Sequence, residues 1–276
     1  MNFISAKSTL KNPQVIITGI PLQGTSSFLE GTSFSPQKIR QASINIETFS
    51  FHLKKDLQDI KIKDAGDLCL SHNLENDLRL ISDYAKKLSS ESKALLIFLG
   101  GEHTITIPIL KGLVDKYRKI NLIYFDAHLD LRDSFNKNKF SHACTLRRIL
   151  EIPQIHRIFH VGARSASKEE FLFKSTKLEI LPPSINSIQK VKKYIGNIPC
   201  YISFDFDFVD SSQLRSVTCP QAGGPSLREV FKIIHALRKI KVIGIDFVEY
   251  NGFIDTYLQD ASFCCEIIRE FILSLQ

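Results

Sequence analysis

The chain has 276 residues, of which 43% are hydrophobic and 24% are charged, and its formal net charge is +7. This composition is typical of a soluble globular protein with a sizeable core, and it excludes a largely disordered chain. The basic residues are dispersed along the chain, so the positive charge does not predict binding to nucleic acid.

Short apolar or β-branched runs alternate with longer amphipathic segments along the chain. The runs are predicted to be strands, and several are apolar on both faces, which is typical of strands covered by helices on either side. In chain order the predicted strands are residues 14–20, 94–99, 121–125, 157–161, 201–206 and 241–248. Helices are predicted for residues 74–90, 106–116, 187–194, 226–237 and 261–273, with Ser226 as an N-cap and Glu229 completing a capping box. The alternation predicts an α/β fold with three layers, α/β/α, and a mostly parallel sheet.

Neither a membrane span nor a signal peptide is predicted. No stretch approaches the ~20 consecutive apolar residues that span a bilayer, and residues 1–11 lack the apolar core and cleavage site of a signal peptide. We therefore expect a cytoplasmic protein that forms one domain over residues 1–276. The cysteines have no metal-type spacing and are expected to be thiols, with Cys264 and Cys265 in the core.

Polar residues follow two of the predicted strands. Gly100-Gly101-Glu102-His103 comes after the strand at 94–99, although a lone histidine after two glycines is more often structural than a ligand. Asp126-Ala127-His128-Leu129-Asp130 comes after the strand at 121–125. If that backbone stays extended, residues two apart share a face, so both carboxylates and the imidazole converge. Such a group is costly without a cation, although a surface turn could still hold it.

The strand at 201–206 delivers a further pair of acids, Asp205 and Asp207, on one face of an otherwise apolar run. One of them could cap a helix, but the pair indicates a metal. Together the candidate ligands are His103, Asp126, His128, Asp130, Asp205 and Asp207. The set is too large for one zinc ion with an open site, and oxygen and nitrogen donors without sulfur suit Mn²⁺ or a similar octahedral ion. Two such ions about 3.5–4 Å apart can hold a bridging hydroxide.

The segments GGEH, DAHLD and SFDFD, in this order, resemble the metal-binding signatures of the ureohydrolases, which include arginases, agmatinases and formimidoylglutamases. The resemblance covers most of the chain. It implies that each motif ends a different strand of one α/β/α domain and that each subunit binds two Mn²⁺. It assigns Asp126 and Asp205 to bridging, His103 and Asp130 to one ion, and His128 and Asp207 to the other. It also implies a homo-oligomer, a trimer or a hexamer.

Two segments are most similar to agmatinases, namely Gly24-Thr25-Ser26-Ser27-Phe28 and Ser141-His142-Ala143-Cys144. The resemblance assigns His142 to proton shuttling, Asp130 to holding the hydroxide and Glu249 to pairing with a guanidinium. The alternatives are a polar loop histidine for His142 and a surface acid for Glu249.

Several positions depart from the family pattern, including Ser211 and Gly252, which stand where the family has proline. Glu102 stands where an aspartate is usual, and residues 216–221 replace a loop that is rich in glycine and threonine and has an acid after its proline. Leu29-Glu30 replaces a basic residue followed by proline. By resemblance the last two segments border the substrate tail.

The leading hypothesis is hydrolysis of agmatine to putrescine and urea. One alternative is a sibling ureohydrolase acting on guanidinobutyrate, formimidoylglutamate or arginine. Another is a catalytically silent binding or assembly subunit.

Overall fold

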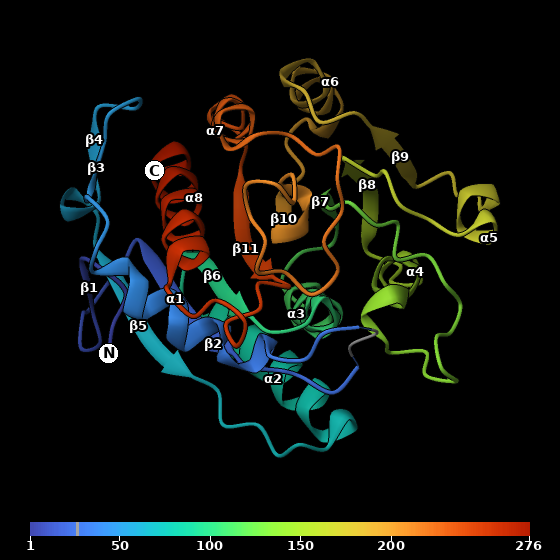
Figure 1. The fold of residues 1–276 in the computed structure, drawn as a ribbon, viewed down its shortest axis with the longest axis horizontal. Coiled ribbons are helices and arrows are strands. Elements are labelled where there is room, and N and C mark those ends of the chain that lie inside the picture. Colours follow the sequence, from blue (N-terminus) through green and yellow to red (C-terminus); the bar gives the residue numbers. More distant parts are fainter. Residues whose placement is uncertain (26–27) are drawn as a thin grey trace.

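A parallel sheet of nine strands forms the centre of the computed structural model, which describes residues 1–25 and 28–276 (Figure 1). The strands are β1 (Ala6–Lys7), β2 (Val15–Ile20), β5 (Ile62–Asp67), β6 (Leu95–Gly100), β7 (Ile120–Phe125), β8 (Ile155–Val161), β9 (Leu178–Leu181), β10 (Cys200–Asp205) and β11 (Val242–Val248). Their order across the sheet is β1-β5-β2-β6-β11-β10-β7-β8-β9. A separate antiparallel hairpin joins β3 (Phe49–Ser50) to β4 (Lys55–Asp56).

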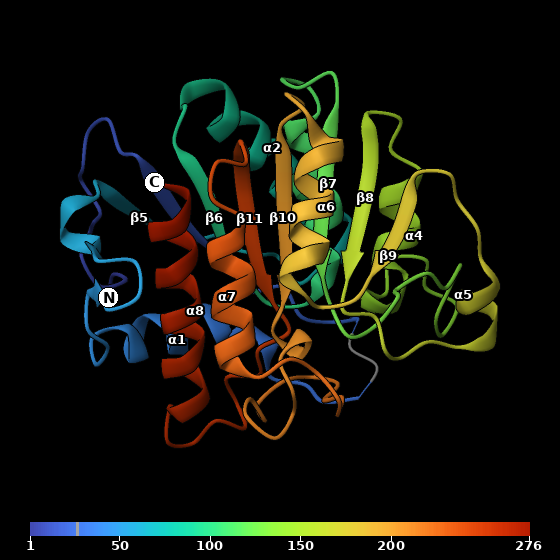
Figure 2. The ribbon, with the colours of Figure 1, turned by 90° about the horizontal axis from the view of Figure 1, so that it is seen from above.

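Helices cover both faces of this sheet. They are α1 (Ser35–Ser43), α2 (Leu74–Glu91), α3 (Thr106–Leu113), α4 (Thr145–Leu150), α5 (Lys168–Leu172), α6 (Ile185–Ile195), α7 (Leu227–Ala236) and α8 (Gln259–Leu275). Figure 2 shows α8, α7 and α6 in front of the sheet, with α2 and α4 behind it. Each face has its own core: Ile202 and Phe204 of β10 pack toward α8, whereas Tyr201, which precedes Ile202, faces the α2 and α3 side. The predicted three-layer α/β/α fold is confirmed.

Helix α8 fills much of one core. Cys264 and Cys265 on α8 are both buried, which confirms their predicted place in the core. Within the described residues, no helix is both long enough and apolar enough to cross a membrane.

The predicted strands and helices are all present, with their bounds shifted by a few residues. The capping box of Ser226 and Glu229 at the start of α7 is also present. Strand β5 and helix α1 were not predicted because their sequences are polar. Asp64 of β5 is buried against Arg40 of α1, with 2.8 Å between Arg40 Nε and Asp64 Oδ2. A buried ion pair hides the apolar alternation by which strands and helices are recognised.

The central strands place the site. Strands β6 and β7 follow each other in the sequence but are not neighbours in the sheet. Strands β11 and β10, which come later in the chain, lie between them. In open parallel sheets, ligands bind beyond the carboxyl ends of the strands at such a reversal of strand order. His103 follows β6, Asp126 follows β7, Asp205 ends β10 and Glu249 follows β11.

Candidate metal centre

The end of β6 is tightly packed, and this packing explains its two glycines. A Cβ on Gly101 would lie 2.0 Å from the carbonyl oxygen of Leu22, and a Cβ on Gly100 would lie 3.0 Å from that of Phe247. Only glycine fits at such distances. The chain can therefore pass between its neighbours and place His103 directly beyond the sheet.

Glu102 holds the N-terminal loop against the site. Its buried carboxylate accepts hydrogen bonds from the backbone N–H groups of Gly24 and Thr25, each at 2.8 Å. Glutamate at this position keeps the carboxylate that a loop contact requires. Ser26 and Ser27 of the agmatinase-like segment lie outside the described residues.

The DAHLD segment converges by a route that differs from the prediction. Strand β7 ends at Phe125, and the backbone at Asp130 is left-handed with φ 52°, so the expectation of a continuously extended backbone is wrong. The carboxylate of Asp130 is positioned instead by Tyr124, whose hydroxyl donates a 2.7 Å hydrogen bond to Asp130 Oδ2. Tyr124 was not predicted, although it lies two residues before Asp126 on the same strand face.

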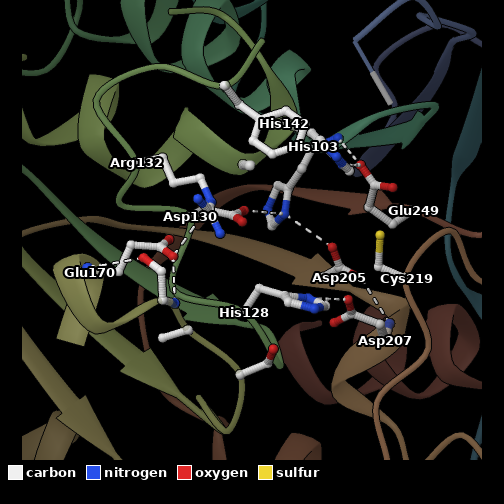
Figure 3. A pocket seen from close by; sticks show the side chains of 15 residues that line it. His103, His128, Asp130, Arg132, His142, Glu170, Asp205, Asp207, Cys219 and Glu249 are labelled. Carbon is white, nitrogen blue, oxygen red and sulfur yellow. Dashed lines mark hydrogen bonds and ion pairs between the residues drawn. The ribbon is translucent and has the colours of Figure 1, made fainter. Parts of the chain in front are cut away.

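The structure brings all the candidate ligands together. Figure 3 shows those that line the pocket, namely His103, His128, Asp130, Asp205 and Asp207. Donor atoms of His103, Asp126 and Asp205 lie within 4.8 Å of one another, as do those of Asp126, His128 and Asp207. Asp126 belongs to both groups, as a bridging ligand would.

Both imidazoles present Nδ1 to this cluster. His103 Nδ1 lies 3.1 Å from Asp205 Oδ2 and 3.4 Å from Asp130 Oδ2. His128 Nδ1 lies 2.7 Å from Asp207 Oδ2.

The acids of the cluster are electrostatically crowded. Burial and the neighbouring carboxylate of Asp126 raise the pKa of Asp130 to about 8. Burial also raises the pKa of Asp205 and of Asp207, with nearby carboxylates adding to the effect. Asp126 Oδ2 is buried and has no hydrogen-bond partner among the described residues. Because such groups are costly without a counter-ion, and because the donors are oxygen and nitrogen only, the residues fit a pair of divalent cations such as Mn²⁺.

A buried relay supports His103 from behind. His103 Nε2 lies 2.8 Å from the hydroxyl of Ser203, which donates a 2.6 Å hydrogen bond to Asp246. The hydroxyl of Tyr201 donates to the same carboxylate at 2.8 Å. The carboxylate of Asp246 therefore lies behind a candidate ligand, to which the hydroxyl of Ser203 connects it.

A cavity of about 270 Å³ opens above the cluster. His142 and Glu249 line it, and so do Arg132, Phe135 and Glu170, which the sequence analysis missed. Glu170 Oε2 lies 3.6 Å from Arg132 Nε. The only local signal for Glu170 is its place in a capping box with Ser167, which predicts a helix start and not a cavity wall.

His142 and Glu249 contact each other in the lining of this cavity, with 3.3 Å between His142 Nδ1 and Glu249 Oε1. Burial opposes protonation of His142, but the carboxylate of Glu249 outweighs it and raises the pKa of His142 to about 9. Glu249 Oε1 also accepts the backbone N–H of His103 at 2.7 Å. Glu249 Oε2 is buried and, within the described part of the chain, has no hydrogen-bond partner.

Comparison with known proteins agrees with this geometry. The model of the Arginase family matches residues 13–274. The chain belongs to the arginase family. It is 36% identical over 248 residues to an agmatinase of Pyrococcus horikoshii, covering 88% of this chain and 86% of that protein.

Two further relatives span nearly the whole chain. The N(1)-aminopropylagmatine ureohydrolase of Thermococcus kodakarensis is 32% identical over 271 residues, 91% of each chain. The structure of the agmatine ureohydrolase of Thermoplasma volcanium has a TM-score of 0.85 and 28% identity, covering 99% of this chain and 93% of that one. The predicted membership of the ureohydrolases, closest to agmatinases, is confirmed, and with it an enzyme that hydrolyses carbon–nitrogen bonds.

Proposed function

We propose that this arginase-family chain hydrolyses agmatine to putrescine and urea with two bound Mn²⁺. The observation that carries the proposal is the convergence of oxygen and nitrogen donors beneath a cavity that is lined by the carboxylate of Glu249. A cation pair at the floor and a carboxylate at the wall suit a substrate that ends in a planar guanidinium.

The ligands would divide between two ions. Asp126 and Asp205 would bridge them, with His103 and Asp130 completing one site and His128 and Asp207 the other. When bound, the ions lower the pKa of water, so that hydroxide is available as the nucleophile near neutral pH. The carboxylate of Asp130, which lies 3.4 Å from His103 Nδ1, would accept a hydrogen bond from the nucleophile.

Glu249 and His142 would act on the substrate itself. A carboxylate can accept parallel N–H bonds from a guanidinium, and Glu249, which lines the cavity, would take this role. Once the guanidinium carbon is attacked, the amine must leave with an added proton. The raised pKa of His142 keeps its imidazole protonated in neutral solution, so His142 can donate that proton to the leaving nitrogen.

The relatives support an agmatine-type substrate. One is named an agmatinase, and another acts on N(1)-aminopropylagmatine, which carries an extension on the agmatine unit. The second name favours a sibling substrate as an alternative. Cys219, Arg132 and Phe135 line the cavity, where they would border the tail that distinguishes such substrates.

A urea-release assay on the manganese-loaded protein tests the proposal. The panel contains agmatine, N(1)-aminopropylagmatine, guanidinobutyrate, arginine and formimidoylglutamate. For formimidoylglutamate, the released formamide is measured instead of urea. We expect the highest kcat/KM for agmatine and no activity in Asp126→Asn. Turnover of another compound but not agmatine would replace the substrate, and Mn²⁺ binding without any turnover would favour a silent binding subunit.

We also propose that residues 1–276 form one domain of a cytoplasmic homo-oligomer, a trimer or a hexamer. Light scattering coupled to gel filtration measures the mass of the assembly. A monomer at micromolar concentration would contradict this proposal.

A further inference from the structure

Gln221 lies behind the metal-ligand candidate His128. His128 Nδ1 faces the acids of the cluster, 2.7 Å from Asp207 Oδ2, whereas its Nε2 faces away from them, 3.2 Å from the amide nitrogen Nε2 of Gln221. We infer that Gln221 is the positioning residue of His128, and that its neutral amide makes the His128 side the weaker of the two cation sites. The inference rests on the proposed metal centre.

The chemistry of imidazole sets the direction of this contact. When Nδ1 of His128 gives its lone pair to a cation, the ring proton is on Nε2, which can then only donate a hydrogen bond. A half-turn of the Gln221 amide replaces its nitrogen by its oxygen at this contact, and the oxygen can accept a hydrogen bond from the Nε2 proton. A partner that accepts this proton fixes the orientation of the ring and increases its strength as a ligand.

Arg164 fixes the distance between Gln221 and the cluster. Its guanidinium donates hydrogen bonds to the backbone carbonyls of Asp207 at 2.7 Å and of Gln221 and Ala222 at 3.0 Å. One side chain therefore ties the backbone of a candidate ligand to that of Gln221. Gly224 completes the fit, because a Cβ there would lie 2.7 Å from Arg164 Nη2.

The two histidines are supported unequally. Behind His103, the hydroxyl of Ser203 leads to the buried carboxylate of Asp246, whereas the contact behind His128 ends in a neutral amide. The side chain of His103 is 1% exposed and that of His128 is 24% exposed. A neutral partner and its own greater exposure to water make His128 the weaker donor, so the ion that it holds is the first to dissociate.

Metal binding by three variants tests this inference without use of the reaction. Apoprotein is titrated with Mn²⁺ by calorimetry, and the visible spectrum of the Co²⁺-loaded protein reports the strength of the ligands. We expect Gln221→Glu to tighten the weaker site and Gln221→Leu to weaken it, each by about tenfold, with opposite shifts of the Co²⁺ bands. Gln213→Glu is the matched control, because exposed Gln213 is in the same loop and only caps Leu227 N–H, which a glutamate also accepts.

Opposite changes at Gln221 are expected only if the residue acts on the ligand, since loss of loop structure would weaken both variants. Unchanged weaker-site affinity in both Gln221→Glu and Gln221→Leu would overturn the inference while leaving the proposed hydrolysis intact. If the wild-type chain bound no Mn²⁺, the inference and the proposed function would fall together. If it bound Mn²⁺ with these shifts but released no urea, only the proposed function would fail.

Discussion

Asp130 and Glu249 share an uncommon backbone conformation. Their φ angles are 52° and 63°, in the left-handed region that residues other than glycine seldom adopt. Such strain persists where the surrounding structure over-determines it, and it is concentrated at functional sites. Here it is retained at two acids that face the same cavity.

His142 can be separated from the metal ligands by substitution. We expect His142→Asn to lower kcat for urea release by about 10²- to 10⁴-fold with little change in Mn²⁺ content, because the leaving amine loses its proton donor. The wild-type kcat should fall at alkaline pH as His142 loses its raised-pKa proton, and the variant should lack that limb. His156→Asn changes an exposed histidine and serves as the control. An undiminished kcat would exclude His142 from proton transfer.

Glu249 is expected to act mainly on substrate affinity and alignment. Glu249→Gln keeps an acceptor for the His103 N–H but removes the charge that faces the guanidinium. Charge-assisted bonds contribute about 1.5–3 kcal/mol, so kcat/KM should fall about 10- to 100-fold. Steady-state kinetics measures this, with exposed Glu169→Gln as the control. Equal kcat/KM in the two variants would contradict the assigned role.

Strand ends, more than strand interiors, decide whether the site forms. The end of β6 has to pass the Leu22 carbonyl before His103 can join the cluster. The two glycines can be recognised in the sequence, but the atoms that crowd them cannot. Those atoms belong to the loop after β2 and to strand β11.

Gly101→Ala tests that requirement. Overpacking costs about 1–3 kcal/mol, so the free energy of unfolding in urea should fall by that amount. The displaced His103 should also lower the Mn²⁺ content of the purified chain. Gly196→Ala, whose Cβ would meet nothing within 4 Å, is strained by its φ of 53° but should keep its Mn²⁺. Full Mn²⁺ content in Gly101→Ala would show that the close packing does not position the ligand.

The fold buries several carboxylates close together in the cluster, and bound cations should therefore stabilise it. Chelation with EDTA should lower the melting temperature. Mn²⁺ at a hundredfold excess over Kd restores about 2.7 kcal/mol, or roughly 5–10 °C for a chain of this size. Differential scanning calorimetry measures the shift, and Asp126→Asn, which lacks the shared ligand, should show a smaller one. Identical melting temperatures with and without Mn²⁺ would argue against two Mn²⁺ bound in the buried cluster.

Much of the fold could be predicted because its determinants are local. Apolar runs and the Ser226 capping box identify their elements from a few neighbouring residues. Strand β5 and helix α1 could not be predicted, since their stability depends on the pairing of Asp64 with Arg40 from another element. The single-domain expectation for residues 1–276 stays a prediction.

The sequence by itself determined which donor atoms the chain offers and which strand ends carry them. Only the tertiary structure decided that Asp126 is shared by both donor groups and that Arg132 and Glu170 wall the cavity. The same holds for Gln221, which lies behind His128 across 93 positions of sequence. Residue patterns specify the local backbone, whereas contacts over such separations depend on how the strands are arranged in the sheet.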